Sequence, residues 1–195
     1  MAKSATYQAV VIGVSAGGIA ALERIFSTLD ATFSLPIMVV QHIAPSGESH
    51  LASHFSSCCS LPVREAMDKE PVTPGKIYLA PANYHLLIEQ HGAMALSTED
   101  KVNYSRPSID VLFTTAAETY GKALVAIVLT GANHDGAAGL ATVARMGGLT
   151  IVQEPATAHV DVMPKAALAA ARVDHVLPLD QIGEFLNTVG SNTKS

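Results

Sequence analysis

The chain has 195 residues, of which 49% are hydrophobic and 15% are Asp, Glu, Lys or Arg, and its formal net charge is −5. This composition is typical of a well-packed globular protein and excludes a disordered segment. The scattered Lys and Arg form no basic stripe, which argues against a nucleic-acid partner. No apolar run is long enough to cross a bilayer and no apolar signal segment opens the chain, so we expect a cytoplasmic protein without membrane insertion.

The first part of the chain alternates strand and helix patterns. An apolar, β-branched run at residues 7–14 stops at Ser15-Ala16-Gly17-Gly18, and helical spacing of apolar residues follows it. A second apolar run at residues 36–40 ends at Gln41-His42, and a Pro45-Ser46-Gly47 turn is expected to open the next helix. These repeats predict consecutive βα units.

The middle of the chain has a different pattern. Short segments around Val63 and at residues 76–80, 84–89 and 93–96 are separated by turn signals, which predicts antiparallel hairpins. Helix and strand patterns then alternate again. Helices are expected from residue 109, through Leu140, Val143 and Met146, and from residues 165 and 179, with strands near 123–129, 150–152 and 175–177.

This order of elements predicts an α/β fold. We expect a doubly wound, mostly parallel sheet in a Rossmann-like three-layer α/β/α arrangement, with the antiparallel hairpins as an insertion or an edge. We expect a single domain over residues 1–189 and a disordered tail at residues 190–195.

Reactive side chains follow three different apolar runs. Ser15, His42 and Asp135 each come shortly after the end of a predicted strand. The carboxyl ends of parallel strands meet at one edge of a sheet, where such folds bind their ligands. A hydroxyl, an imidazole and a carboxylate at that edge form a candidate catalytic triad, in which sequence separation is no obstacle.

Ser15 lies in Gly13-Val14-Ser15-Ala16-Gly17, which matches the G-x-S-x-G pattern of a sharp strand-to-helix turn around a nucleophile. The helix N-terminus behind the turn would offer amides to an oxyanion. A dinucleotide-binding loop is the rival interpretation, but the spacing misses G-x-G-x-x-G and Gln41-His42 stands where a ribose-binding carboxylate would be expected. The order Ser, His, Asp also differs from that of α/β-hydrolases.

The other two positions have alternatives. An Asp before a helix commonly serves as its N-cap, and Asp135 precedes a helix pattern. His134 is a second candidate base, which spacing alone leaves open. Most of the eight histidines fit surface or partner-facing positions better than catalytic ones, and we assign these four to that group: His50, His54, His85 and His91.

Four segments together resemble the catalytic domain of CheB-type chemotaxis methylesterases: residues 11–18, Gln41-His42, residues 106–113 and residues 129–139. The resemblance covers residues 9–186. It implies hydrolysis of glutamyl methyl esters on chemoreceptors and deamidation of receptor glutamines, with Ser15 as nucleophile, His42 as its base and Asp135 as the partner of the histidine. The implied acyl transfer needs no metal or cofactor.

The resemblance also suggests which groups surround the triad. The amides of Ala16 and Gly17 are the oxyanion candidates, and Ala132, Arg106 and Met163 are candidate lining residues. The chain departs from the family at Ala16, where Thr is frequent, and at residues 132–134, where Met-Gly-Asn is frequent. Both departures bear on substrate preference and rate.

The implied partners are methyl-accepting chemoreceptors or related methylated proteins. The regulatory form of the family carries a receiver domain before the esterase, whereas the first predicted strand here follows Met1 within a few residues. We therefore expect either constitutive activity or control by a separate response-regulator protein. Two alternative functions stay open: a non-catalytic adaptor that binds signalling proteins, and an esterase or amidase acting on another carboxyl substrate.

Overall fold

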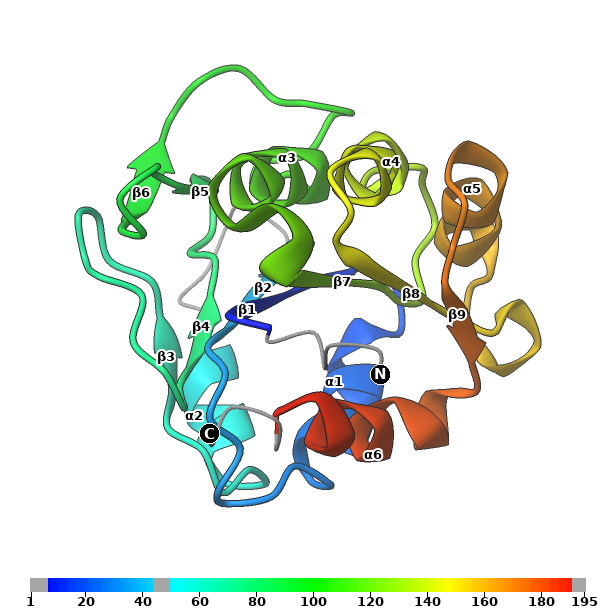
Figure 1. Cartoon of the computed structure of the whole chain (residues 1–195), viewed down its shortest axis with the longest axis horizontal. Coiled ribbons are helices and arrows are strands. Elements are labelled where there is room, and N and C mark those ends of the chain that lie inside the picture. The colour runs from blue at the N-terminus through cyan, green and yellow to red at the C-terminus, as the bar shows by residue number, and fades with distance from the viewer. Residues whose placement is uncertain (1–6, 44–49, 191–195) are drawn as a thin grey trace, which may run out of the picture.

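A seven-stranded parallel sheet forms the centre of the protein in the computed structural model, which describes residues 7–43 and 50–190 (Figure 1). Its strand order is β3-β4-β2-β1-β7-β8-β9, and β5 and β6 form a separate antiparallel pair. The strands are β1 (Ala9–Val14), β2 (Ile37–Gln41), β3 (Val63–Glu65), β4 (Ile77–Leu79), β5 (His85–Ile88), β6 (Met94–Ser97), β7 (Leu124–Val128), β8 (Leu149–Gln153) and β9 (His175–Leu177).

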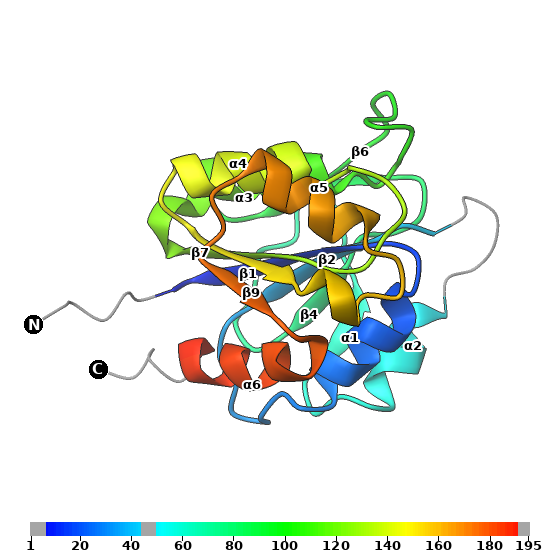
Figure 2. The ribbon, with the colours of Figure 1, turned by 90° about the vertical axis from the view of Figure 1, so that its right-hand side faces the viewer.

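Helices cover both faces of this sheet. Figures 1 and 2 show α3, α4 and α5 on one face and α1, α2 and α6 on the other. The helices are α1 (Gly18–Phe26), α2 (Leu51–Ser56), α3 (Ile109–Tyr120), α4 (Ala137–Arg145), α5 (Val162–Ala170) and α6 (Leu179–Gly190), with short 3-10 turns η1 (Gly121–Ala123) and η2 (Pro155–Thr157). The prediction of a three-layer, mostly parallel α/β fold is confirmed.

The central strands are buried on both faces, which is why they read as continuous apolar runs. Every residue of β1, β2 and β7 is buried. Their side chains alternate between two cores: Val10 and Ile12 pack on the side of α1 and α6, whereas Ala9 and Val11 pack on the side of α3 and α4. The sheet therefore divides the hydrophobic core into two layers.

The prediction of several antiparallel hairpins in the middle of the chain is wrong for its first two segments. β3 and β4 belong to the main sheet and run parallel to it, with Ile77 of β4 in register with both Ile37 of β2 and Val63 of β3. Only β5 and β6 pair as an antiparallel hairpin. Turn signals mark where short strands end, but the strand direction depends on how the connecting segment crosses the sheet, which the turn residues do not encode.

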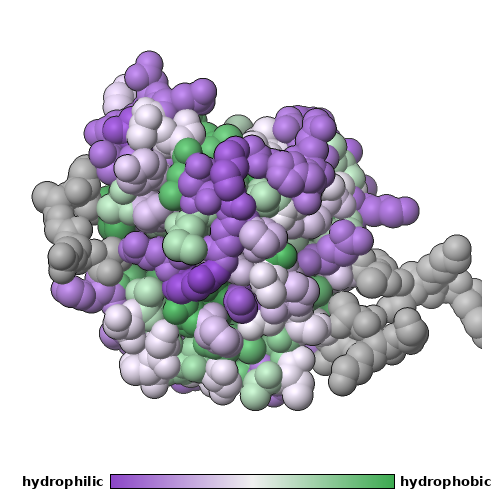
Figure 3. Space-filling view, turned by 90° about the vertical axis from the view of Figure 1, so that its left-hand side faces the viewer, coloured by the Kyte–Doolittle hydropathy of each residue, from purple (hydrophilic) through white to green (hydrophobic). Residues whose placement is uncertain are grey.

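The β3 edge of the sheet carries charge. Figure 3 looks onto this side of the molecule and shows hydrophilic side chains spread over it, with apolar atoms between them. Arg64 of β3 is paired with Glu70, and Lys69 with Glu89. Charged side chains at an edge strand disfavour pairing with a strand of another molecule.

The last helix extends one residue into the predicted tail. Gly190, expected in the tail, is the last residue of α6 and is buried, whereas residues 191–195 and the Pro45-Ser46-Gly47 turn lie outside the described residues. Within residues 7–43 and 50–190, no helix combines the length and apolar character needed to cross a membrane.

The strand order places the functional edge. From β1 the chain moves one way to β2 and β4, and from β7 it moves the other way to β8 and β9, so the order reverses between β1 and β7. Gly13 of β1 is in register with Val40 of β2 and Val128 of β7, so these three strands end level. Ligands bind at such a reversal, outside the carboxyl ends of the strands.

Candidate active site

The turn after β1 holds Ser15 at this edge. The Ser15 N–H donates to the Thr130 carbonyl (3.0 Å), and the Gly18 N–H donates back to the Ser15 carbonyl (2.9 Å). Gly17 adopts φ +78°, a left-handed conformation that favours glycine, and precedes the first residue of α1. The sharp turn expected from the G-x-S-x-G pattern is present, and it ties the end of β1 to the loop after β7.

Two amides of this turn remain available. Among the described residues, neither the Ala16 N–H nor the Gly17 N–H has a hydrogen-bond acceptor. The Thr130 hydroxyl donates to the Ala16 carbonyl (2.8 Å) and so fixes the orientation of the peptide group between Ala16 and Gly17. In a trans peptide the N–H points opposite to the C=O, so the Gly17 N–H points away from Thr130. Free amides at a helix N-terminus can hold a negative oxygen.

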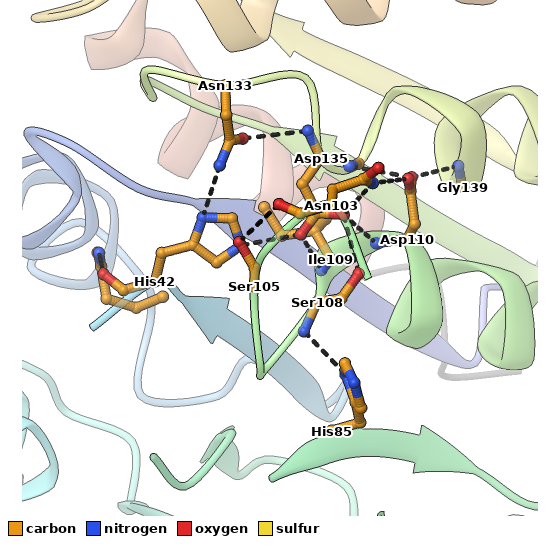
Figure 4. A network of polar contacts seen from close by, with 12 residues as sticks. His42, His85, Asn103, Ser105, Ser108, Ile109, Asp110, Asn133, Asp135 and Gly139 are labelled. Atoms are coloured by element: carbon orange, nitrogen blue, oxygen red, sulfur yellow. Dashed lines mark hydrogen bonds and ion pairs between the residues drawn. The ribbon is translucent and has the colours of Figure 1, made fainter. Parts of the chain in front are cut away.

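His42 and Asp135 are in direct contact. His42 Nε2 lies 2.8 Å from Asp135 Oδ2, the Asp135 side chain is fully buried, and that of His42 is 12% exposed (Figure 4). An ionised carboxylate only accepts hydrogen bonds, so Nε2 carries the proton and Nδ1 keeps its lone pair. The remaining ring nitrogen, Nδ1, accepts a hydrogen bond from Asn133 Nδ2 (3.4 Å). Nδ1 is therefore the ring nitrogen of His42 that can accept a proton.

Asp135 is held by more than the histidine. Its Oδ1 accepts hydrogen bonds from the Ser108 hydroxyl (2.8 Å), the Asp110 N–H (3.1 Å) and Asn103 Nδ2 (3.1 Å), and its Oδ2 accepts one from the Ile109 N–H (2.7 Å). Burial acts to raise the pKa of Asp135, but the hydrogen bonds from His42 and these groups outweigh it and lower the pKa below 3.8. Asp135 therefore stays ionised beside the imidazole.

The alternative in which Asp135 caps its own helix is wrong. Gly136 is the N-cap of α4, and the Asp135 carboxylate instead binds amides at the start of α3. The structure brings His42, and not the exposed His134, to Asp135. The spatial neighbour of Asp135 comes from a different element, which helix-start patterns do not reveal.

The surface assignment of His85 is also wrong. His85 is 2% exposed, accepts a hydrogen bond from the Ser108 N–H through Nδ1 (3.1 Å), and its Nε2 lies 3.0 Å from the Asp100 carbonyl. It thereby fixes Ser108, which binds Asp135. His50, His54 and His91 are exposed, as expected.

Gln41 connects the nucleophile turn to the histidine. Its buried side-chain amide donates to the Ser15 carbonyl (3.0 Å) and to the His42 carbonyl (2.9 Å). A Cβ at Gly18 would collide with Gln41 Oε1, so glycine at this position makes room for the amide. In the sequence, the only signal for this role of Gln41 is its position next to His42.

Ser15 and His42 are adjacent but not hydrogen-bonded through their side chains. Val14 and Gln41 are in register, and the His42 N–H donates to the Val14 carbonyl (3.0 Å). Within residues 7–43 and 50–190, Ser15 Oγ has no hydrogen-bond partner. Catalytic hydrogen bonds often form or tighten only when substrate is bound, and in this structure the Asn133 amide occupies the Nδ1 lone pair that the Ser15 hydroxyl would use.

The three candidate lining residues occupy different places. A small cavity of about 130 Å³ beside His42 is lined in part by Arg106, whose guanidinium also donates to the Thr98 carbonyl (2.7 Å). Met163 is buried and lies against Gly131, where an added Cβ would collide with its sulfur and stand 2.9 Å from Ser15 Cβ. Ala132 is exposed on the loop after β7.

Residues that sequence reasoning gave no role complete the site. Ser108 and Asp110 flank the predicted helix start at Ile109, in a segment that carries the resemblance. Asn133 belongs to the departure at residues 132–134, and Asn103 carried no signal. All five contact a residue at least 25 positions away: Asn103, Ser108, Ile109 and Asp110 contact Asp135, and Asn133 contacts His42. Asn133 also accepts a hydrogen bond from the nearby Asp135 N–H.

Comparisons with known proteins identify the family of this chain. The CheB methylesterase family model matches residues 10–186. A Leptospira interrogans protein, provisionally named protein-glutamate methylesterase/protein-glutamine glutaminase, is 46% identical over 95% of this chain and 96% of its own length. Caulobacter vibrioides protein-glutamate methylesterase/protein-glutamine glutaminase 2 is 40% identical over 92% of this chain, which spans about half (53%) of that relative.

A solved structure has the same fold. The crystal structure of the Thermotoga maritima CheB methylesterase catalytic domain superposes with a TM-score of 0.89 at 38% identity, covering 94% of this chain and 98% of that one. The resemblance drawn from four short segments thus extends over nearly the whole fold. The chain belongs to the CheB methylesterase family.

Proposed function

We propose that this protein is a protein-glutamate methylesterase that hydrolyses glutamyl methyl esters through Ser15, His42 and Asp135, with glutaminase activity toward glutamine side chains at the same site. The observation that carries the proposal is the His42–Asp135 hydrogen bond, which leaves Nδ1 as the proton acceptor at the edge where Ser15 follows β1. Family membership and the names of the Leptospira and Caulobacter relatives support the reaction.

The first half of the reaction acylates Ser15. The hydroxyl oxygen attacks the ester carbonyl carbon while His42 Nδ1 takes its proton, and Nε2–H remains bonded to Asp135. The amides of Ala16 and Gly17 receive the negative charge on the carbonyl oxygen, a contribution of about 3 kcal/mol per well-placed donor. The C–O bond to the methoxy group then breaks, and Nδ1 returns the proton so that methanol leaves.

The second half releases the product. A water molecule attacks the glutamyl ester of Ser15 while Nδ1 takes one of its protons, and the Ser15 oxygen leaves with that proton. The product is a free glutamate side chain. A glutamine substrate follows the same course, except that the C–N bond breaks and ammonia leaves in place of methanol.

We propose methylated chemoreceptor helices as the substrate, by analogy with what the family hydrolyses, and such a substrate would place the enzyme in the cytoplasm. The nucleophile turn and the His42 cavity lie at one open edge of the sheet, which suits access by a side chain that projects from a larger protein. Ala16 and residues 132–134, where the chain departs from frequent family residues, border this edge.

The experiment measures methanol release from methyl-esterified receptor cytoplasmic domains by the wild type and by Ser15→Ala, His42→Ala and Asp135→Asn. We expect each substitution to lower kcat by about 10³-fold or more, because the three groups act as one unit. Thr150→Val is the matched control. It removes a buried hydroxyl that binds Asp174 near the amino end of β8, away from the carboxyl ends that hold the site, and should leave kcat unchanged.

Two results would contradict the proposal. Release that persists at more than a tenth of the wild-type rate in Ser15→Ala would exclude this serine as the nucleophile. A folded wild type that binds the receptor but releases neither methanol nor ammonia would favour the adaptor function, and activity confined to other esters would favour the third alternative.

A further inference from the structure

The starts of α3 and α4 cap each other. Asp135 precedes α4, but its carboxylate accepts hydrogen bonds from the Ile109 and Asp110 amides in the first turn of α3. Asp110 lies in that turn, and its Oδ1 accepts hydrogen bonds from the Gly136 N–H (2.9 Å) and the Gly139 N–H (2.7 Å) at the start of α4. Each helix start therefore receives its capping carboxylate from the other side, and Figure 4 shows Asp135 beside Ile109 and Asp110 joined to Gly139.

Asn103 joins the two carboxylates. Its Nδ2 donates to Asp110 Oδ2 (2.8 Å) and to Asp135 Oδ1 (3.1 Å). An amide NH₂ group has two hydrogens, so it can serve both acceptors at once. Asn103 adopts φ +50°, a left-handed conformation that Asn tolerates better than most residues. The loop that carries it is shaped to present this amide between the two acids.

The pair of acids is held by amides instead of cations. In the described part of the chain, neither Asp110 nor Asp135 has a Lys or Arg partner, and backbone N–H groups at two helix starts supply much of the compensation. Burial raises the pKa of Asp110; the Gly139 amide opposes the rise and the neighbouring Asp135 charge adds to it. Keeping a second carboxylate here costs free energy, which calls for a role beyond filling space.

We propose that Asp110 is a positioning residue for the hydrolysis, which together with Asn103 fixes the Asp135 carboxylate in the orientation that His42 requires. Three contacts carry this action: the Asp110 N–H on Asp135 Oδ1, the shared Asn103 amide, and the Asp110 carboxylate on Gly136, the residue directly after Asp135. Asp110 does not touch the reacting atoms. The inference rests on the proposed function of the His42–Asp135 pair.

The same arrangement affects the charge on the histidine. The titratable and charged groups around His42 are Asp135, which is hydrogen-bonded to it, and Lys101 and Arg106, which line the same cavity. His85 lies behind Ser108, which binds Asp135. Asp110 adds a negative charge behind Asp135, which favours the protonated imidazole that forms during catalysis. The uncharged Asn103 amide stabilises both carboxylates by donating a hydrogen bond to each. Loss of Asp110 removes a negative charge, whereas loss of Asn103 leaves both charges less stabilised, so the two losses act on His42 in opposite directions.

The test compares Asp110→Asn and Asn103→Gly with the wild type. In Asp110→Asn the new NH₂ group faces the NH₂ of Asn103, so the bridge is lost; in Asn103→Gly the bridge is lost while glycine keeps the left-handed backbone. We expect kcat for methanol release to fall about 10-fold to 100-fold in both variants, with KM nearly unchanged, because misplacement of a catalytic group acts on the chemical step.

Two further measurements separate positioning from loss of stability. The acid limb of the pH dependence of kcat should move to lower pH in Asp110→Asn and to higher pH in Asn103→Gly. The proton NMR signal of the His42 Nε2–H, identified by its absence in His42→Ala, should shift or broaden in both. Asp174→Asn is the matched control: Asp174 also accepts two hydrogen bonds, from the Thr150 N–H and hydroxyl, but at the opposite edge, so kcat, limb and signal should stay unchanged.

Folded Asp110→Asn with wild-type kcat, acid limb and NMR signal would overturn the inference, and if that variant does not fold, Asn103→Gly decides it by the same criteria. The two proposals fail separately. A wild type without methanol release would remove the proposed function, whereas the His42 signal would still report whether Asp110 and Asn103 hold the His42–Asp135 pair.

Discussion

The turn after β1 and the loop after β7 lie side by side at the same edge of the sheet, but they differ in how far their polar groups are hydrogen-bonded. In the turn, Ser15 Oγ and the amides of Ala16 and Gly17 have no partner among the described residues. In the loop, Asp135 accepts hydrogen bonds from five different residues: His42, Asn103, Ser108, Ile109 and Asp110.

This difference in hydrogen bonding matches the stage of the proposed reaction at which each group meets a charge. A carboxylate that orients a histidine has the same charge throughout the reaction, so all of its hydrogen bonds can be made in advance. Donors for an oxyanion meet their charge only in the transition state, and donors already paired in the ground state would give less differential stabilisation. Acyl transfer at this edge therefore favours unpaired N–H donors in the turn and a fully hydrogen-bonded carboxylate in the loop.

Removing the charge of Asp135 should break the saturated side and give the largest effect on stability. Asp135→Asn places an NH₂ group against backbone N–H donors, and we expect it to lower the free energy of unfolding at pH 7 by about 2 kcal/mol, or about 30-fold in the folding equilibrium. The folded pKa of Asp135 lies below the unfolded value of 3.8, so its contribution is present above pH 3.8 and is lost as the pH falls through the folded pKa.

Urea unfolding of the wild type and Asp135→Asn between pH 7 and pH 3 measures this difference. The gap between the two proteins should stay constant down to about pH 4 and narrow below it. A gap that widens on acidification would show that the carboxylate does not stabilise the folded state in its charged form.

Gln41→Met should break the link between the two sides while keeping the volume of the side chain. Methionine cannot donate to the Ser15 and His42 carbonyls, so the nucleophile turn loses its tie to the histidine. We expect kcat to fall about tenfold with a small change in KM. Single-turnover assays beside Thr150→Val, a buried change far from the site, would check it; equal losses in both variants would point to stability alone.

Tyr104→Asn changes neither the turn after β1 nor the loop after β7, and it has the smallest expected effect. The Tyr104 ring is 95% exposed, lines the His42 cavity and sits on a backbone with φ +62°, which Asn tolerates. A contact made only with bound substrate should raise KM about threefold, or ~0.7 kcal/mol, at constant kcat. Val176→Ala, at an exposed position on β9, should leave KM unchanged, and a fall in kcat in Tyr104→Asn would place the ring in the chemical step instead.

Much of the fold and part of the site could be read from the sequence. Residues 7–14, 36–40 and 123–129 are continuous apolar runs because β1, β2 and β7 are buried on both faces, and periodicity reports burial directly. The positions of Ser15, His42 and Asp135 after those runs follow from the same pattern. The contact between His42 and Asp135 then follows from parallel strands that end level.

Other features were decided only by the tertiary structure. The direction of β3 and β4, the burial of His85, the tie through Gln41 and the exchange of caps between Asp110 and Asp135 all depend on residues far apart in the chain. Local patterns record what a residue needs, such as burial, a turn or a cap. The distant residue that provides this burial, turn or cap is determined only by the packing of the whole chain. In this protein, such long-range contacts orient the candidate triad.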